Sequence, residues 1–336
     1  MRKISIIALM VSVCVLLVSC QDKSATTERD SAKVQKAQPA AVAKPAKPSA
    51  EIVEKCKLFM PPWGEENWSE WWQANPEKGE KWFSEVQGNM AKADLSIISK
   101  CTHLTNMLVG FAPLTDLKVF AGLTQLKRLD VRFAMKVTDL SPLASLKNLE
   151  HLSIWSTSVS DLSPLKNLDK LKTINARMTK ITDLKPIANM KSLEGIDLLK
   201  TEVSDISPLA KVPNIKDILV CTTNVGDLSP LYKIAEKIRY LDLCNTPFVQ
   251  YQELKKFSQI KILKLWGKQL GKLDFLTPML TLEELDLSET TFESLKPIYN
   301  LKNLKKITML KVQYKQEEID ELKRSIPGVE LILALD

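Results

Sequence analysis

The chain has 336 residues, of which 45% are hydrophobic and 26% are charged, a composition typical of a globular protein rather than a disordered or polytopic membrane protein. Its formal charge of +7 is too small, and its basic residues are too dispersed, to indicate nucleic-acid binding. Ten glycines and two histidines, His103 and His151, offer little for phosphate-binding loops, histidine-based catalysis or metal sites. We therefore expect a protein that is not an enzyme and that uses no cofactor or metal.

Residues 1–19 have the organisation of an export signal. Two basic residues precede an apolar run over 4–18, which is shorter than the roughly 20 residues that span a bilayer. The run ends in Leu17-Val18-Ser19-Cys20, which resembles the lipobox of bacterial lipoproteins. The resemblance implies a cell-envelope protein anchored by an acylated Cys20, in the outer membrane where the cell has two membranes. An ordinary signal peptide with an incidental cysteine is the alternative.

Residues 20–50 are expected to form a flexible tether. The segment consists mainly of Ala, Lys, Pro, Gln and Ser, and such a composition cannot bury enough apolar surface to order its backbone. A flexible chain of this length has an end-to-end distance of about 30 Å. The segment therefore connects the predicted lipid anchor to a folded domain.

Residues 94–315 repeat with a period of 22. Five successive units begin with an Asp-Leu-Ser-Pro-Leu motif or a close variant, at Asp139, Asp161, Asp183, Asp205 and Asp227. Extending the period in both directions gives about ten units. Their L-x-x-L-x-x-L-x-x-L-x-L spacing resembles the leucine-rich repeat. The resemblance implies an α/β solenoid, in which each unit adds one short parallel strand to a concave sheet and stacks on its neighbours.

Two columns of the repeat have predicted structural roles. The aspartate that opens a unit is placed to cap a short helical turn on the convex side, and proline three residues later suits the first turn of such a helix. A threonine follows six of the predicted strands, at a position where the wider family often has an asparagine that bonds the backbone of neighbouring coils. We expect the same role for Thr157, Thr179, Thr201, Thr223, Thr246 and Thr290.

Both ends of the array require caps. The segment 51–93 is predicted to be a helical cap that covers the first unit, and a platform for glycan or peptidoglycan is the alternative. At the other end, 316–336 is predicted to form a polar helix followed by a closing strand. The first cap contains five of the seven tryptophans of the chain: Trp63, Trp68, Trp71, Trp72 and Trp82.

Four cysteines remain after the signal and the lipidation site are set aside. A disulfide between Cys56 and Cys101 would join the N-terminal cap to the first unit, and two buried thiols are the alternative. Cys221 and Cys244 occupy the same concave column in adjacent units, at a strand spacing within the range of a disulfide, although parallel side chains would strain it. That pair is left open between a bridge and two thiols.

Taken together, the repeats and the N-terminus resemble an internalin-like bacterial leucine-rich-repeat protein on a lipoprotein anchor. The resemblance implies a monomeric protein that binds a protein partner on its concave face. An immunoglobulin-like domain and a wall-sorting tail are absent from the sequence, so a role in host invasion is not implied. A structural protein of the envelope, attached to cell wall or glycan through the tryptophan-rich cap or the tether, is the alternative function.

The solvent-facing columns of the strands identify candidate contact residues. Trp155 is expected between Arg132 and Arg177 on neighbouring strands, with Arg128 and His151 beside it. Tryptophan and arginine are enriched at interface hot spots. The second candidate cluster is Tyr240, Ile262 and Trp266. The alternative is that these large side chains only cover one another on a solvated sheet.

Later strands are acidic, so the concave face is predicted to have a basic end and an acidic end, the latter made by Asp197, Asp217, Asp242, Glu284 and Asp286.

Overall fold

The computed structural model describes residues 48–60, 90 and 92–334, which all belong to the larger of the two units into which the chain divides, Pro45–Asp336. The predicted signal peptide, Cys20 and the five tryptophans of the first cap lie outside the described residues. Among the residues that are described, no helix has both the length and the apolarity needed to cross a bilayer.

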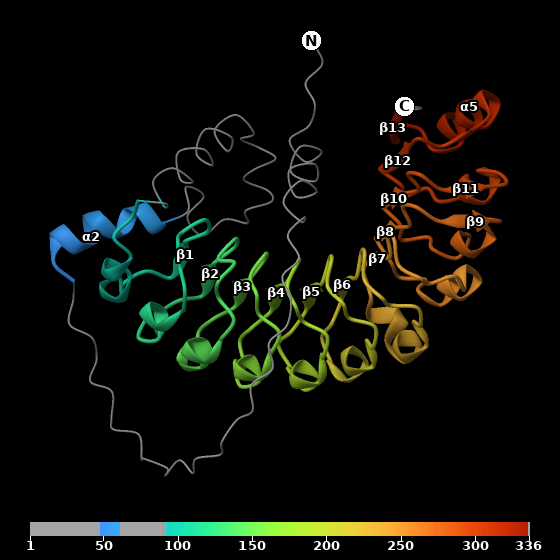
Figure 1. Cartoon of the computed structure of the whole chain (residues 1–336). Coiled ribbons are helices and arrows are strands. Elements are labelled where there is room, and N and C mark those ends of the chain that lie inside the picture. Colours follow the sequence, from blue (N-terminus) through green and yellow to red (C-terminus); the bar gives the residue numbers. More distant parts are fainter. Residues whose placement is uncertain (1–47, 61–89, 91, 335–336) are drawn as a thin grey trace, which may run out of the picture. The chain divides into compact units, whose positions relative to one another are not determined.

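The described residues form one parallel sheet of 11 strands in simple sequential order, which lines the inner side of an arc of stacked coils (Figure 1). Ten strands come from the repeats, and the last comes from the C-terminal cap. Within the repeats, paired residues are 22 or 23 positions apart, so the observed register is the predicted one. The fold is a leucine-rich-repeat solenoid, as predicted. The strands are β1 Asn106–Leu108, β2 Arg128–Asp130, β3 His151–Ser153, β4 Thr173–Asn175, β5 Gly195–Asp197, β6 Asp217–Leu219, β7 Tyr240–Asp242, β8 Ile262–Lys264, β10 Glu284–Asp286, β12 Lys306–Leu310 and β13 Glu330–Ala334.

Short 3₁₀ helices line the outer side of the arc, one per coil. The predicted capping is confirmed, because the carboxylate of Asp139 accepts the N–H of Ser141 at 2.8 Å and the equivalent bond recurs in neighbouring coils. At the C-terminal end, the hydroxyl of Ser294 replaces the carboxylate and accepts the N–H of Lys296 at 3.2 Å. The helices are η2 Leu95–Lys100, η3 Lys118–Phe120, η4 Ser141–Ser145, η5 Ser163–Leu165, η6 Lys185–Ile187, η7 Ser207–Lys211, η8 Ser229–Lys237, η9 Tyr251–Lys256, η10 Asp274–Leu276 and η11 Lys296–Ile298.

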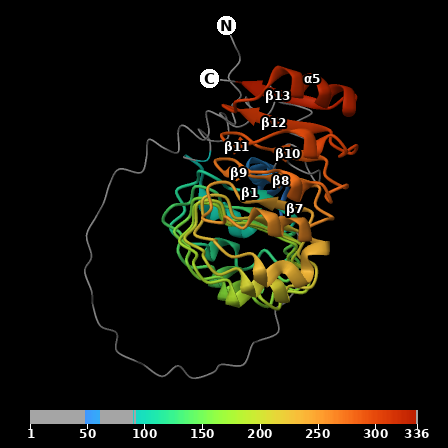
Figure 2. The same ribbon diagram turned by 90° about the vertical axis from the view of Figure 1, so that its right-hand side faces the viewer.

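The core runs without interruption through the stack, and in Figure 2 successive coils lie one behind another. Most of the core side chains come from the leucine positions of the repeat. Leu193, for example, is fully buried, whereas Lys191 two residues earlier is exposed. A second sheet of two short strands, β9 Gln269–Gly271 and β11 Thr291–Phe292, joins two of the later coils. Each coil therefore buries its apolar side against its neighbours, which is the basis of stability in a solenoid.

The turn that follows each strand contains one residue with a left-handed backbone. Ser156 (φ 56°) and Met178 (φ 54°) are examples, and Gly267 (φ 74°) fills the same position in a later coil. In six of the coils the next residue is one of the threonines of the predicted column. The hydroxyl of Thr157 donates to the carbonyl oxygen of Ile154 at 2.7 Å, and the other five threonines bond in the same way within their own coils. The expected bonds to the backbone of neighbouring coils are therefore wrong, because the sharp turn brings each hydroxyl back to its own coil. The hydroxyl of Thr246 in addition accepts a bond from the ammonium of Lys268 in the next coil, at 3.0 Å.

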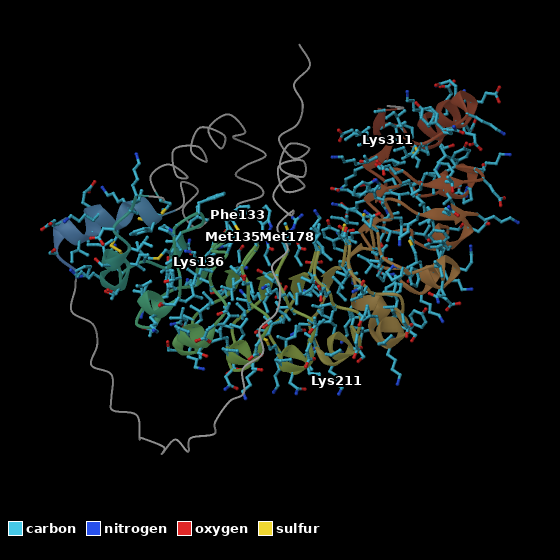
Figure 3. All side chains as sticks on the ribbon, in the orientation of Figure 1. Phe133, Met135, Lys136, Met178, Lys211 and Lys311 are labelled. Carbon is cyan, nitrogen blue, oxygen red and sulfur yellow. A yellow bond between two sulfur atoms is a disulfide. The ribbon has the colours of Figure 1, made fainter. Side chains whose placement is uncertain are left out.

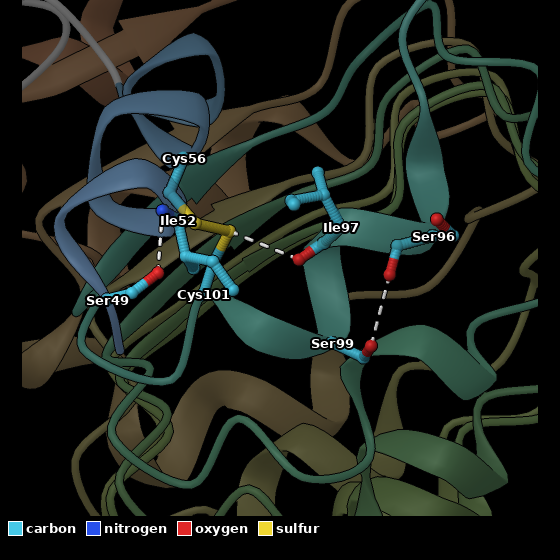
Figure 4. The surroundings of a disulfide bond; sticks show 7 residues. All are labelled: Ser49, Ile52, Cys56, Ser96, Ile97, Ser99 and Cys101. Atoms are coloured by element: carbon cyan, nitrogen blue, oxygen red, sulfur yellow. Dashed lines mark hydrogen bonds between the residues drawn. A yellow bond between two sulfur atoms is a disulfide. The ribbon is translucent and has the colours of Figure 1, made fainter. Parts of the chain in front are cut away.

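The two ends of the solenoid are covered by helices. At the N-terminus, helix α2 (Ala50–Cys56) begins at Ser49, whose hydroxyl accepts the N–H of Ile52 at 3.4 Å, and continues into η1 (Lys57–Phe59). A disulfide joins Cys56 to Cys101, with 5.7 Å between the Cα atoms (Figure 4). At the C-terminus, helix α5 (Gln316–Ser325) precedes β13, which completes the sheet beside β12, as the sequence predicts.

Candidate binding surface

The side chain of Trp155 lies between two arginines on neighbouring coils. The guanidinium carbon of Arg132 is 5.6 Å from the centre of the indole, and that of Arg177 is 5.2 Å from it. Arg132 is also held by Asp130, whose carboxylate accepts the guanidinium Nε–H at 2.8 Å. Trp155 and both arginines are half-buried. The structure thus brings together the three residues that the register placed side by side.

Two phenylalanines extend this arrangement, and sequence reasoning missed them. The centre of the Phe133 ring is 4.8 Å from that of the Trp155 ring, and Phe111 stacks on Phe133 at 4.5 Å between ring centres. Both phenylalanines occupy the left-handed position after the strand, with φ of 67° and 61°. The leucine spacing does not show where that position places a side chain. We call Phe111, Phe133, Trp155, Arg132 and Arg177 the Trp155 patch.

A groove of about 150 Å³ lies beside the patch, over β1 to β4. Arg128 and His151 line it, as do residues of the neighbouring strands. The Nδ1 atom of His151 is 2.8 Å from the hydroxyl of Thr173. Burial, reinforced by the charge of Arg128, lowers the pKa of His151 to about 4, so this imidazole is neutral at physiological pH. The positive charge of the groove therefore comes from arginine and not from histidine.

Three buried polar atoms in this region have no hydrogen-bond partner among the described residues: Ser153 Oγ, Trp155 Nε1 and Arg177 Nε. They belong to two adjacent coils. Arg177 Nε is 3.6 Å from a carboxylate oxygen of Asp197, which gives charge attraction but is beyond hydrogen-bond distance. Buried polar groups are nearly always paired in folded proteins. Each of the three atoms carries a hydrogen to donate, and each is shielded from solvent, so an acceptor on a partner would reach it only if neighbouring side chains move.

The second predicted cluster is less continuous. Tyr240 and Ile262 are register partners on β7 and β8, but Trp266 lies four residues further along the chain than Ile262. Lys264 lies between them in sequence, and its ammonium is 5.4 Å from the centre of the Tyr240 ring. Burial raises the pKa of Tyr240 to about 12. A cation therefore interrupts the apolar surface that the sequence predicts, and the Trp155 patch is the stronger candidate.

The acidic end of the concave face is weaker than its composition suggests. Burial raises the pKa of Asp197 and that of Asp217, which disfavours their charged forms. Asp242 is buried. Asp197 also faces Arg177 at 3.6 Å. Much of the predicted acidic charge is thus screened within the protein.

Cys221 and Cys244 are free thiols, so the bridge that the sequence left open is not formed. Both side chains are buried, with 6% and 3% of their surfaces exposed. They lie in the same concave column on neighbouring coils, beside Asp242. Cys56 and Cys101, by contrast, form the disulfide described above.

Comparisons with known proteins agree with the fold. A family model for two copies of the leucine-rich repeat matches residues 147–189. The internalin InlF of Listeria monocytogenes has a similar structure, with a TM-score of 0.58 and 22% identity over 71% of this chain and 76% of that one. A leucine-rich-repeat protein of Leptospira interrogans gives a TM-score of 0.50 and 15% identity, over 70% of this chain and 74% of that one. No curated protein matches the sequence significantly.

Proposed function

We propose that this chain is a non-enzymatic binding protein, held at the bacterial cell envelope by a lipid on Cys20, and that its concave face binds a protein partner at the Trp155 patch. The observation that carries the proposal is the half-buried indole of Trp155, which lies between the guanidinium groups of Arg132 and Arg177 on the neighbouring coils.

The chemistry of the patch suits a protein interface. Tryptophan and arginine supply a disproportionate share of binding energy at such interfaces, especially where they are packed by neighbours. Here Phe133 and the two arginines hold the indole in place before a partner arrives. A side chain that is already ordered loses less conformational entropy on binding. The patch is therefore preorganised for recognition.

Site-specific photo-crosslinking in the native envelope tests this function. A photoreactive residue at Thr173, which lines the groove, should give an adduct with one protein that mass spectrometry can identify. The matched control carries the same residue at Lys211, which lies on the outer side of the arc (Figure 3). The proposal requires an adduct specific to Thr173. The same adduct from both positions, or from Lys211 alone, would exclude the concave face.

The anchor requires its own experiment, because Cys20 lies outside the described residues. We expect the Cys20→Ala chain to remain unprocessed or to leave the membrane fraction. Metabolic labelling with a palmitate analogue should mark the wild-type chain and not the variant. Unchanged processing and membrane retention of the variant would contradict the lipid anchor and leave the binding surface unaffected.

A further inference from the structure

Three potential metal-binding atoms converge on the concave side of β6 and β7. The sulfur atoms of Cys221 and Cys244 and a carboxylate oxygen of Asp242 all lie within 4.8 Å of one another. The three residues are 6%, 3% and 6% exposed. Two thiols and a carboxylate held together away from solvent need an explanation that the leucine-rich repeat alone does not provide.

The strand register fixes the relative positions of the two cysteine backbones. The N–H of Val220 donates to the carbonyl oxygen of Asp242 at 3.0 Å, and that of Thr222 donates to the carbonyl oxygen of Cys244 at 2.7 Å. These bonds flank the cysteine pair and hold it in register. Adjacent strands are about 4.8 Å apart, and in-register side chains point in the same direction. The Cβ atoms of a disulfide lie closer, at about 3.8 Å, so a direct bridge would require the strands to distort.

A bound metal ion can bridge the two thiols at the undistorted strand spacing. Zinc–sulfur bonds of about 2.3 Å in a tetrahedral site place two sulfur atoms about 3.8 Å apart. The three atoms here lie within 4.8 Å of one another, so rotation of the two thiol side chains can bring the sulfur atoms to that spacing. Thiolate ligands select zinc and similar thiophilic ions over magnesium and calcium. We propose that Cys221, Cys244 and Asp242 form a binding site for a thiophilic divalent cation such as Zn²⁺, with water as the fourth ligand.

The surroundings of the site support this assignment. The N–H of Cys244 donates to one carboxylate oxygen of Asp242 at 3.1 Å, which orients the carboxylate and leaves its other oxygen for the ion. Binding of the ion releases the proton of each thiol. Two thiolates and one carboxylate then leave the occupied site with a net charge of about −1. Lys264 interacts electrostatically with Asp242 and Cys244, and Lys268 with both cysteines, so cationic groups offset that charge.

Titration of the purified mature chain with Cd²⁺ and Zn²⁺ tests the site. Cadmium should produce an ultraviolet thiolate-to-metal absorption band that saturates at one equivalent, and zinc should displace it. Cys221→Ser and Cys244→Ser should each abolish the band, while Asp242→Asn should weaken zinc binding about tenfold or more. The matched control is Asp286→Asn. Asp286 accepts an equivalent bond from the N–H of Ser288 at 2.9 Å in a coil without the thiols, so its substitution should leave zinc affinity unchanged.

Two results would overturn the proposal. The first is the absence of both the band and zinc binding in protein whose two thiols are shown, by alkylation after unfolding, to be reduced. The second is metal binding that persists in both serine variants. A disulfide between the pair in purified protein can be reduced before titration, and failure to bind metal afterwards also counts against the site. None of these outcomes depends on the identity of a protein partner.

Discussion

The ammonium group of Lys268 is bonded to the carbonyl oxygen of Thr246 in the preceding coil and lies 3.0 Å from the hydroxyl of that threonine. Its third acceptor is the carbonyl oxygen of Phe248 at 3.5 Å. Lys268 is only 5% exposed and occupies the column that holds threonine in the coils on either side. At this one position, a side chain of that column connects two coils instead of closing its own turn.

Replacing Lys268 by methionine should therefore destabilise the protein. The change preserves most of the aliphatic volume but leaves buried carbonyl oxygens without their donor, at a cost of about 1–3 kcal/mol. Chemical denaturation measures the effect. Lys268→Thr should cost less, because its hydroxyl can bond within its own coil as Thr246 and Thr290 do. Equal stability of the methionine variant and the wild type would show that the ammonium contributes nothing.

Loss of the disulfide should loosen the N-terminal cap. Cys56 and Cys101 are 45 residues apart, and the chain-entropy estimate for closing a loop of that size is about 4 kcal/mol. We expect a Cys56→Ser/Cys101→Ser chain to unfold at lower denaturant concentration. Hydrogen exchange should localise the increased opening to α2 and η2. Faster exchange in the C-terminal coils alone would contradict this assignment.

A charge in the core should disrupt the array. Leu193 is fully buried, so Leu193→Asp places a carboxylate among apolar side chains with no partner, at an expected cost of several kcal/mol. Lys191→Asp, two residues away on the exposed side, is the matched control and should change stability by less than about 0.5 kcal/mol. Thermal unfolding followed by circular dichroism compares the two variants.

His151 should make stability depend on pH. Burial, with the charge of Arg128, lowers its pKa from 6.5 to about 4 in the folded protein, so the unfolded chain takes up the proton first as pH falls. Stability should decline between about pH 6.5 and pH 4 and lose no more below that range. Because the imidazole is only half-buried, we expect a loss on the order of 1 kcal/mol after solvent screening.

The His151→Gln variant isolates this effect, since glutamine can still bond to Thr173 but does not titrate. Urea unfolding at several pH values should give a shallower decline for the variant than for the wild type. Identical curves would mean that His151 is protonated equally in the folded and unfolded chains.

Binding of the partner should depend on the indole of the patch. Once crosslinking has identified the partner, Trp155→Ala should weaken its binding by about 2 kcal/mol, which is roughly 30-fold in Kd. Arg177→Ala should weaken it as well, because the guanidinium that lies 5.2 Å from the centre of the indole is lost. Leu280→Ala is the control, since Leu280 is a 58% exposed leucine outside the concave columns. Calorimetry on folded variants distinguishes these outcomes.

The sequence alone predicts most of the solenoid, for a physical reason. A 22-residue period assigns each leucine to one column, and a single register then determines which residues are neighbours on adjacent strands. That is why the sequence is sufficient to place Arg132, Trp155 and Arg177 together. The same reasoning correctly placed helix α5 and the strand after it at the end of the array.

Features that depend on the turn geometry could not be predicted in this way. Among the residues that take the left-handed position after a repeat strand, only Gly267 is a glycine, so the sequence lacks the glycines that usually mark such a position. The stacking of Phe111 on Phe133 at this position could therefore not be predicted. The direction of the threonine bonds depends on the same turn. Whether Cys221 and Cys244 form a disulfide depends on a change of about 1 Å in the distance between their Cβ atoms, and a repeat period does not specify that distance so finely.

The in-register sheet also fixes the distances between surface features along the solenoid. Trp155 follows β3 and Cys221 follows β6, three strand spacings away, so about 14 Å of sheet separates the aromatic patch from the thiol pair. That distance can change only in steps of about 4.8 Å, by gain or loss of a whole coil. A point substitution can alter either location without changing their separation, whereas duplication of a single 22-residue unit between them would move the two apart by one fixed increment.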